Sequence, residues 1–389
     1  MCLRQEPITM CLLAVGKTLA LVPENRDSMP GSSTPRLRQP IFKPNLRERL
    51  MNPAWTVVDG LQYSAWSREV FEQMHAGGLN AVHVTVAYHE TTRDTLTQLG
   101  EWNARFEAFP DLIKPVFEPQ DIHKAKQEGK IGIIFGAQNC SPIEDEIRLV
   151  EIMRRMGLMI MQLTYNNQSL LGCGCYEAED SGLTRYGKQV VREMNRVGMV
   201  IDMSHSAERS TLEAIEHSQQ PVIISHANPS HFHPALRNKS NAVIDAIADN
   251  QGLLGFSLYP FHLKNGPQCS LEDFCDMVAW TAERMGIDRI GLGSDLCQNQ
   301  PQSVLEWMRN GRWSKAMDYG EGSSANAGWP DALTWFKDSR DFPGIAAALQ
   351  AKGFNDEETG KIMGGNWVDL LTRVAKPQGI EPLSVESAA

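Results

Sequence analysis

Two segments of the chain end in the same pair of residues, a serine followed by a histidine. One apolar run ends at Ser204 and His205, a second ends at Ser225 and His226, and a third ends at Asp295. Two imidazoles and a carboxylate at the ends of neighbouring strands form a nitrogen and oxygen ligand set that suits zinc, iron or manganese. A lone strand-end histidine is usually structural, and Asp295 alone fits a helix N-cap. The repeated ending favours a site.

The surrounding pattern predicts a (β/α)8 barrel, an α/β fold of the TIM type. Predicted strands span residues 56–59, 81–87, 131–137, 158–164, 199–204, 221–225, 252–257 and 289–293. Predicted helices span 66–76, 92–106, 144–156, 185–196, 207–217, 242–248 and 271–285. Such barrels place their active sites where the strands end. The alternative is an open doubly wound sheet, but no Gly-x-Gly-x-x-Gly turn follows the first strand.

The barrel is predicted to occupy residues 54–375, with an insertion around 300–340 that caps its mouth. Residues 1–53 are predicted to be a disordered or extended tail, because a Pro-, Gly- and Ser-rich stretch follows a weakly apolar segment that makes a poor signal peptide. Whether residues 1–28 belong to the natural product stays open. Residues 376–389 form a C-terminal tail.

Composition narrows the classes of function. The 389 residues are 42% hydrophobic and carry a net charge of −10, so we expect no nucleic-acid partner. No run of about 18 apolar residues occurs, so no membrane-spanning helix is expected. The eight cysteines form no paired framework, which favours free thiols and a cytoplasmic location.

Five segments together resemble the membrane (renal) dipeptidase family, peptidase family M19. They are residues 201–205, 221–228, 237–238, 291–295 and 362–367. The resemblance implies a (β/α)8 barrel with two bridged zinc ions, cleavage of dipeptides and a homodimer. It implies that His205 and His226 hold one zinc, and that Asp295 lies near the other zinc and handles the proton of the catalytic water. Arg237 matches the arginine that binds the substrate carboxylate. Its planar fork suits that task, although a solvated loop arginine is an equal alternative.

Four positions depart from the family pattern. Leu61 and Tyr63 stand where a histidine and an aspartate are expected, Gln138 replaces the bridging glutamate, and Tyr165 replaces a histidine. Together these changes remove the ligands of one of the two metal ions, so one bound ion is expected rather than two. Zn²⁺ is favoured, with Fe²⁺ or Mn²⁺ as alternatives.

The sequence therefore predicts a one-metal hydrolase that acts on a dipeptide or another small amide with a carboxylate end. His205, His226 and Asp295 are the predicted ligands, and Asp295 and Tyr165 the predicted catalytic residues. Arg237, Tyr63 and Gln138 are assigned to substrate binding. The alternative is a non-catalytic or iron-dependent, non-hydrolytic barrel.

Replacement ligands for the lost positions are a further open question. His83 and His89 lie on one face of the predicted second strand, and Cys140, Cys297 and the pair at 173 and 175 follow other strands.

Overall fold

The structure is a computed structural model that describes residues 52–312, 314–315 and 318–375. The predicted tails lie outside the described residues, apart from residues 52 and 53. Neighbouring parallel strands follow the order β1 (Val58–Gln62), β2 (Ala81–Ala87), β4 (Ile131–Ala137), β5 (Leu158–Gln162), β6 (Val200–Asp202), β7 (Val222–Ile224), β8 (Leu253–Phe256) and β9 (Ile290–Leu292). A short strand β3 (Ile113–Pro115) pairs with β4.

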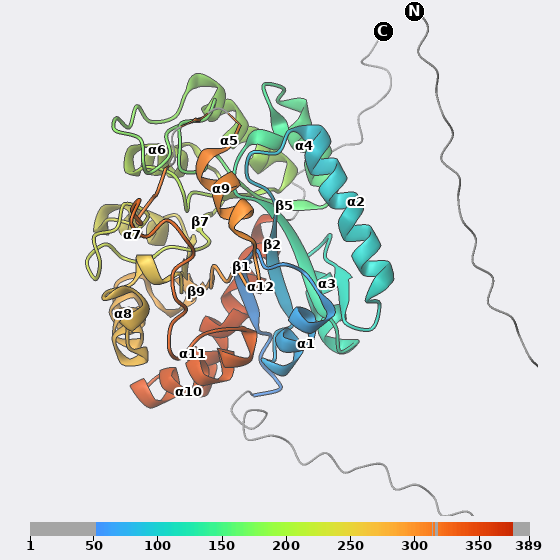
Figure 1. The fold of residues 1–389 in the computed structure, drawn as a ribbon, viewed down its shortest axis with the longest axis vertical. Coiled ribbons are helices and arrows are strands. Elements are labelled where there is room, and N and C mark those ends of the chain that lie inside the picture. The colour runs from blue at the N-terminus through green and yellow to red at the C-terminus, as the bar shows by residue number, and fades with distance from the viewer. Residues whose placement is uncertain (1–51, 313, 316–317, 376–389) are drawn as a thin grey trace, which may run out of the picture. The chain divides into compact units, whose positions relative to one another are not determined.

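The sheet closes on itself between its first and last strands. The amide of Tyr63 donates to the carbonyl of Leu296 over 3.0 Å, and the amide of Asp295 donates to the carbonyl of Leu61 over 3.1 Å. The chain is therefore an eight-stranded parallel barrel with helices around it, as predicted (Figure 1). The open doubly wound alternative is wrong, because its sheet would have two free edges.

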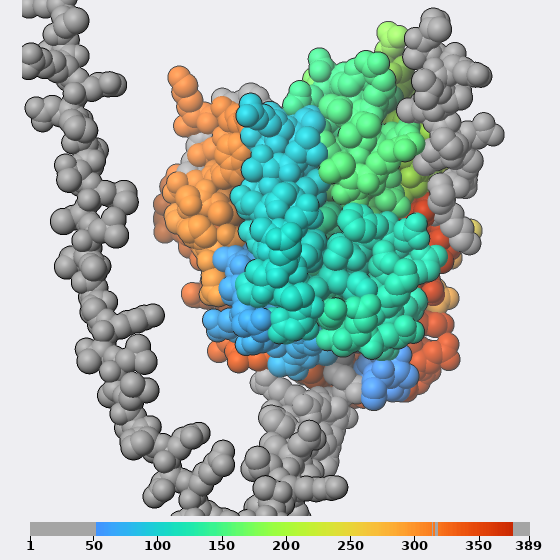
Figure 2. Space-filling view, turned by 90° about the vertical axis from the view of Figure 1, so that its right-hand side faces the viewer, coloured from blue at the N-terminus to red at the C-terminus, as the bar shows by residue number. Residues whose placement is uncertain are grey.

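Helices follow the strands and surround the barrel. They are α1 (Arg68–Ala76), α2 (Thr92–Ala108), α3 (Gln120–Gln127), α4 (Arg148–Arg155), α5 (Arg185–Val197), α6 (Glu208–His217), α7 (Asn241–Asp249) and α8 (Leu271–Met285). Figure 2 shows α2 on the outer surface beside residues 113–130. Ser67, Ser240 and Ser270 accept a backbone N–H at the starts of α1, α7 and α8, which fixes where these helices begin.

In the part of the chain that the structure describes, four α-helices follow the last strand: α9 (Gln302–Asn310), α10 (Phe342–Lys352), α11 (Asp356–Gly360) and α12 (Asn366–Val374). Helix α9 lies in the predicted insertion. Its Leu305 and Met308 share an apolar cluster with Leu61 and Tyr63, so α9 covers the strand ends there. No helix among the described residues is long and apolar enough to cross a membrane.

Helix α12 fills the opposite end of the barrel. Trp367 is buried in a cluster with the first residues of β1, β6 and β8, namely Val58, Val200 and Leu253. Its indole N–H donates to the carbonyl of Leu292 over 2.8 Å. A Cβ at Gly60 would lie 2.2 Å from the Trp367 ring, so the glycine makes room for it. The open end of the barrel is therefore the end where the strands finish.

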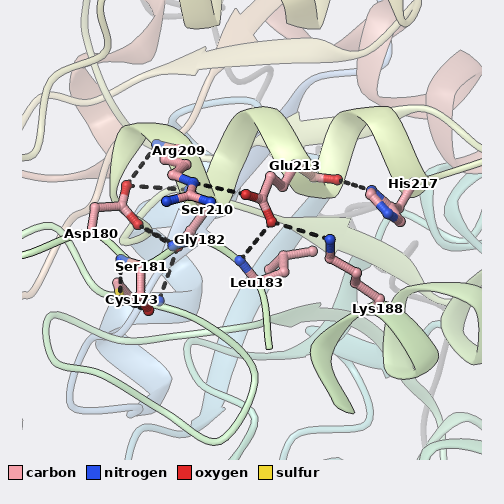
Figure 3. Close-up of polar contacts among 10 residues, drawn as sticks. All are labelled: Cys173, Asp180, Ser181, Gly182, Leu183, Lys188, Arg209, Ser210, Glu213 and His217. Carbon is pink, nitrogen blue, oxygen red and sulfur yellow. Dashed lines mark hydrogen bonds and ion pairs between the residues drawn. The ribbon is translucent and has the colours of Figure 1, made fainter. Parts of the chain in front are cut away.

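A polar network fixes the long loop between β5 and α5 (Figure 3). Asp180 accepts the amide of Arg209 over 2.6 Å and the amide of Ser210 over 3.2 Å, so a loop carboxylate caps the start of α6. Glu213 accepts the amide of Leu183 over 3.0 Å. This loop carries Asn166 and Tyr176, which line the mouth.

All eight predicted strands are present, and β2 and β4 have the predicted bounds. Strand β3 and helix α3 were not predicted. Strand β3 has three residues, too few for a period-two pattern, and α3 has only two buried residues, Ile122 and Ala125.

Candidate active site at the barrel mouth

The two Ser-His strand ends are joined through one carboxylate. Asp202, the last residue of β6, accepts the hydroxyl of Ser204 over 2.6 Å and the hydroxyl of Ser225 over 2.5 Å. It also accepts both serine amides, each over 3.0 Å. Both serines therefore donate their protons to Asp202, which explains why the same residue type precedes each histidine.

These bonds determine which nitrogen of His226 carries the proton. Because the Ser225 hydroxyl donates to Asp202, its oxygen accepts from His226 Nδ1 over 2.6 Å. The Nε2 atom of His226 then keeps its lone pair. In the same way His205 Nδ1 donates to Asn166 Oδ1 over 2.6 Å, which leaves a lone pair on His205 Nε2.

Three acceptor atoms converge at this point. The Nε2 atoms of His205 and His226 are 3.0 Å apart, and Gln138 Oε1 lies 2.9 Å from His205 Nε2. The Gln138 amide donates to Thr85 Oγ1 over 2.8 Å, which turns its oxygen towards the imidazoles. Burial, assisted by the charge of Arg237, holds the pKa of both imidazoles well below the usual value. The cluster is neutral and rich in lone pairs, so it suits a cation.

Arg237 supplies one positive charge beside this cluster. Its Nη2 atom lies 3.2 Å from His205 Nε2 and donates to the carbonyl of His226 over 3.2 Å, and its Nη1 atom donates to the carbonyl of Ser204. The side chain is 2% exposed. The guanidinium is thus held by the strand ends themselves, and its predicted role with a substrate carboxylate stays a prediction.

Asp295 lines the same cavity as His205, but among the described residues no hydrogen bond joins it to either imidazole. It follows β9 with a left-handed φ of 60°, and burial raises the pKa of its carboxyl to about 7 although Arg237 opposes the shift. Among the described residues, no three or more His, Cys, Asp or Glu side chains are grouped as a metal site. Gln138 Oε1 is the third acceptor at the imidazole pair, so Asp295 as a metal ligand also stays a prediction.

Three of the four positions that depart from the family pattern form an apolar and aromatic wall. Leu61, Tyr63 and Tyr165 are buried in one cluster that also includes Tyr88. The Tyr165 ring is stacked on the His205 ring with centroids 4.1 Å apart. Burial raises the pKa of the Tyr63 and Tyr165 phenols above the usual value, so both remain protonated hydrogen-bond donors.

A small cavity of about 70 Å³ connects these groups, and its lining includes every predicted catalytic and substrate-binding residue and His205. His226 is fully buried behind it. Several lining residues were not predicted from the sequence, including Tyr176, Tyr259, Arg309 and Glu321. Arg309 lies on α9, and no strand-end pattern marks a residue contributed by an insertion.

Four of the six possible replacement ligands lie elsewhere. His83 Nδ1 bonds to the carbonyl of Gly60 over 2.7 Å inside the barrel, and its ring packs against Gly136. His89 Nε2 bonds to the carbonyl of Met308 over 3.2 Å. Cys140 borders a separate groove beside His89, and Cys297 borders a second pocket that Asp295 also lines. None of these four side chains lines the cavity.

Comparison with known proteins places the chain in a family. The membrane dipeptidase family (peptidase family M19) matches residues 58–308, more than half of the chain. The chain belongs to this family. The family is metal-dependent, so the question is whether the residues at the mouth can hold a metal ion.

Individual relatives agree with this assignment. A dipeptidase of Claviceps purpurea, tcpJ, is 26% identical over 303 residues, which are 76% of this chain and 64% of the relative. A dipeptidase of Aspergillus oryzae, aclJ, is 26% identical over 53% of this chain and 50% of its own length. The chain thus spans between half and two thirds of these two relatives.

Solved structures show the same fold. An amidohydrolase of Pseudomonas aeruginosa is 34% identical with a TM-score of 0.79, covering 84% of this chain and 98% of its own. A metallo peptidase of Rhodobacter sphaeroides, liganded with a phosphinate mimic of L-Ala-D-Ala, is 16% identical with a TM-score of 0.68, over 82% of this chain and 99% of its own.

The donor set at the mouth fits one metal ion of the kind that the family uses, but not a bridged pair. Two imidazole nitrogens and the Gln138 oxygen already point to a common place. On the side of Asp295, Leu61 and Tyr63 offer a hydrocarbon and a protonated phenol, neither of which replaces an imidazole or a carboxylate.

Proposed function

We propose that this protein is a hydrolase of small amides, dipeptides included, that carry a carboxylate end, and that it uses one metal ion. The observation that supports this most is the convergence of His205 Nε2, His226 Nε2 and Gln138 Oε1 at the mouth of a barrel of the membrane dipeptidase family. His205, His226 and Gln138 would hold a zinc ion, which would polarise the substrate carbonyl and acidify a bound water.

The remaining roles belong to residues of the cavity. Among the described residues the Asp295 carboxylate accepts no hydrogen bond, so it is the group to accept the proton of the attacking water. Tyr165 and Tyr63 line the same cavity as protonated phenols and can donate to the oxygen that gains negative charge. Arg237 and Arg309 provide the positive charges for the substrate carboxylate.

One contact favours the alternative, a ligand-binding barrel without a metal. Arg237 Nη2 lies 3.2 Å from His205 Nε2, so a guanidinium already offers a proton to one of the lone pairs. In that case the cavity binds a small molecule and performs no hydrolysis. The homodimer implied by the family is a separate proposal, which light scattering on the full chain tests.

Two measurements on the full chain test the proposed function. Elemental analysis of protein purified without added metal should give about one zinc, iron or manganese per chain. A panel of dipeptides and N-acyl amino acids should include a substrate that the wild type cleaves and the His205→Ala variant does not. Metal-loaded protein that cleaves nothing on the panel, or an active metal-free protein, would contradict the proposal.

A further inference from the structure

Asp295 is a buried carboxylate without a partner. It is 8% exposed and lines the cavity, and among the described residues its side chain forms no hydrogen bond and no ion pair. The charges that act on it, Arg237 and Asp59, do so at a distance. A buried carboxylate that no cation contacts is costly to keep charged, so a cation bound directly to this one would stabilise its charged form.

The walls around Asp295 are aromatic. Tyr63, Tyr165 and Tyr259 line the same cavity, and the negative charge of Asp295 acts on all three phenols. The Tyr63 ring lies 6.1 Å from the Trp329 ring. Rings of this kind attract an organic cation through their negative faces, and most strongly where water is excluded.

The ligands that a second metal would need are absent on this side. Leu61 is 0% exposed and Tyr63 is 5% exposed, and they stand at the two positions that are histidine and aspartate in the family pattern. A small, strongly hydrated divalent ion would find Asp295 and no second charged ligand there. An alkylated ammonium is larger and weakly hydrated, so it suits one carboxylate surrounded by rings.

The opposite charges lie on other parts of the cavity. The Arg237 guanidinium bonds to the carbonyls of Ser204 and His226, and the Arg309 guanidinium bonds to the carbonyl of Ala327 and lies 6.0 Å from the Tyr319 ring. A second carboxylate, Glu321, accepts the Tyr176 hydroxyl over 3.2 Å. The cavity therefore has separate places for a positive and a negative group.

We propose that the aromatic cavity beside Asp295 binds an organic ammonium group, in the place where a second metal ion would lie in a two-metal site. The proposal deepens the proposed function. The substrate then carries an ammonium group at Asp295 and a carboxylate towards Arg237 and Arg309.

Calorimetric titration of the full chain tests the binding without any need for turnover. The protein is treated with a chelator, and tetramethylammonium chloride, methylammonium chloride and the neutral neopentyl alcohol are titrated at constant ionic strength. We expect at least one of the two cations to bind about tenfold or more tightly than the alcohol. The tighter of the two cations shows whether the site prefers an alkylated or a primary ammonium.

Variants identify the site. Asp295→Asn should weaken cation binding about tenfold or more and leave the alcohol unchanged, and Tyr63→Leu should weaken it several-fold. Glu272→Gln, at an exposed carboxylate in the first turn of α8, is the matched control and should bind like the wild type. Circular dichroism melting shows which variants are folded, and Tyr63→Leu decides the test if Asp295→Asn is not.

Three outcomes would overturn the proposal: equal binding of the alcohol, unchanged cation binding by folded Asp295→Asn, or equal weakening by Glu272→Gln. Failure of the proposed function looks different. Cation binding without cleavage of any amide would refute the hydrolase and leave the ammonium site. Cleavage of an amide by a protein that does not prefer the cations to the alcohol would support the hydrolase and refute the ammonium site.

Discussion

The Nε2 atoms of His205 and His226 lie 3.0 Å apart, and each ring donates the proton on its other nitrogen to a neighbouring oxygen. Two lone pairs therefore face each other in a buried site. Such an arrangement is favourable only when a positive charge or a proton lies beside them. A metal ion and the Arg237 guanidinium are the two candidates, and they lead to different experiments.

Removing either imidazole should remove the metal. We expect His205→Ala and His226→Ala each to lower bound metal from about one per chain to near zero. Each variant keeps only one imidazole and the Gln138 oxygen, and two uncharged ligands are too few to hold the ion. The barrel should stay folded, since both residues lie at strand ends. Elemental analysis with circular dichroism makes the measurement. Full metal content in both variants would show that the ligand assignment is wrong, and two tightly bound ions in the wild type would refute the one-metal interpretation.

Asp202 should determine which nitrogen of His226 carries the proton, although Asp202 does not contact a metal-binding side chain. Asp202→Asn keeps the shape of the side chain but leaves it only one acceptor oxygen. One of the two serine hydroxyls, Ser204 or Ser225, must then donate its proton elsewhere. If Ser225 donates to His226 Nδ1, the proton moves to Nε2 and that nitrogen no longer binds a metal. We expect metal affinity to fall by about 10–100-fold, as for other residues that orient ligands. Competition with a chromophoric chelator measures this change. Unchanged affinity in a folded variant would contradict the role of the Asp202 network.

Sequence patterns predicted the barrel and those residues of its mouth that lie at strand ends. The strands were predictable because each is a short apolar run, and parallel strands place their ends together whatever the loops do. That His205, His226 and Gln138 lie at the same end of the barrel follows from that rule, but their convergence on one point does not. Arg309 and Tyr259 were not predictable in the same way, because they come from α9 and the loop after β8, whose positions depend on tertiary packing.

The surroundings of Asp295 are the feature of the site that could least be predicted from the sequence. The motif places it at a strand end, and its left-handed conformation and the lack of a hydrogen bond to its carboxylate among the described residues appear only in three dimensions. The same holds for Lys239, an unremarkable loop lysine in the sequence that is 3% exposed in the structure.

Trp367 should be a main determinant of stability, because it fills the closed end of the barrel. Trp367→Ala should lower the free energy of unfolding by about 3–5 kcal/mol, and Gly60→Ala should also destabilise, since its Cβ would overlap the same ring. Urea denaturation measures both. Ile152→Ala, at a side chain that is 47% exposed on α4, is the control and should change stability by less than about 0.5 kcal/mol. A Trp367→Ala variant as stable as the control would contradict this packing.

Lys239 should make stability depend on pH. Burial lowers the pKa of its ammonium to about 7 in the folded protein, and its Nζ donates to the carbonyl of Ser206 over 2.8 Å. Between this value and the pKa of about 10.4 in the unfolded chain, the unfolded state holds one more proton. The free energy of unfolding should therefore rise with pH across this window.

The difference between wild type and Lys239→Met isolates this effect from the buried cysteines. Unfolding free energies measured at pH 7.5, 8.5 and 9.5 should rise more steeply in the wild type, by up to about 1.4 kcal/mol per pH unit. Parallel pH profiles would show that Lys239 keeps its ordinary pKa.

The wild type should be a poor hydrolase of simple dipeptides, and one substitution should not change this. In a two-metal site a bridging carboxylate holds both ions and the water between them. Gln138→Glu supplies that charge but leaves Leu61 and Tyr63, which cannot hold a second ion. The new carboxylate would raise the pKa of neighbouring acids by like-charge repulsion.

The triple variant Leu61→His, Tyr63→Asp, Gln138→Glu should bind more zinc than the wild type, whereas the single variant should not. Wild type, single and triple variants are compared on a dipeptide panel with added zinc, with metal content measured alongside. We expect low turnover in the first two. Wild-type rates in the usual enzymatic range of about 1–1000 per second would show that the family ligands missing here are not needed. The aromatic wall beside Asp295 would then have to form part of an active site for ordinary dipeptides.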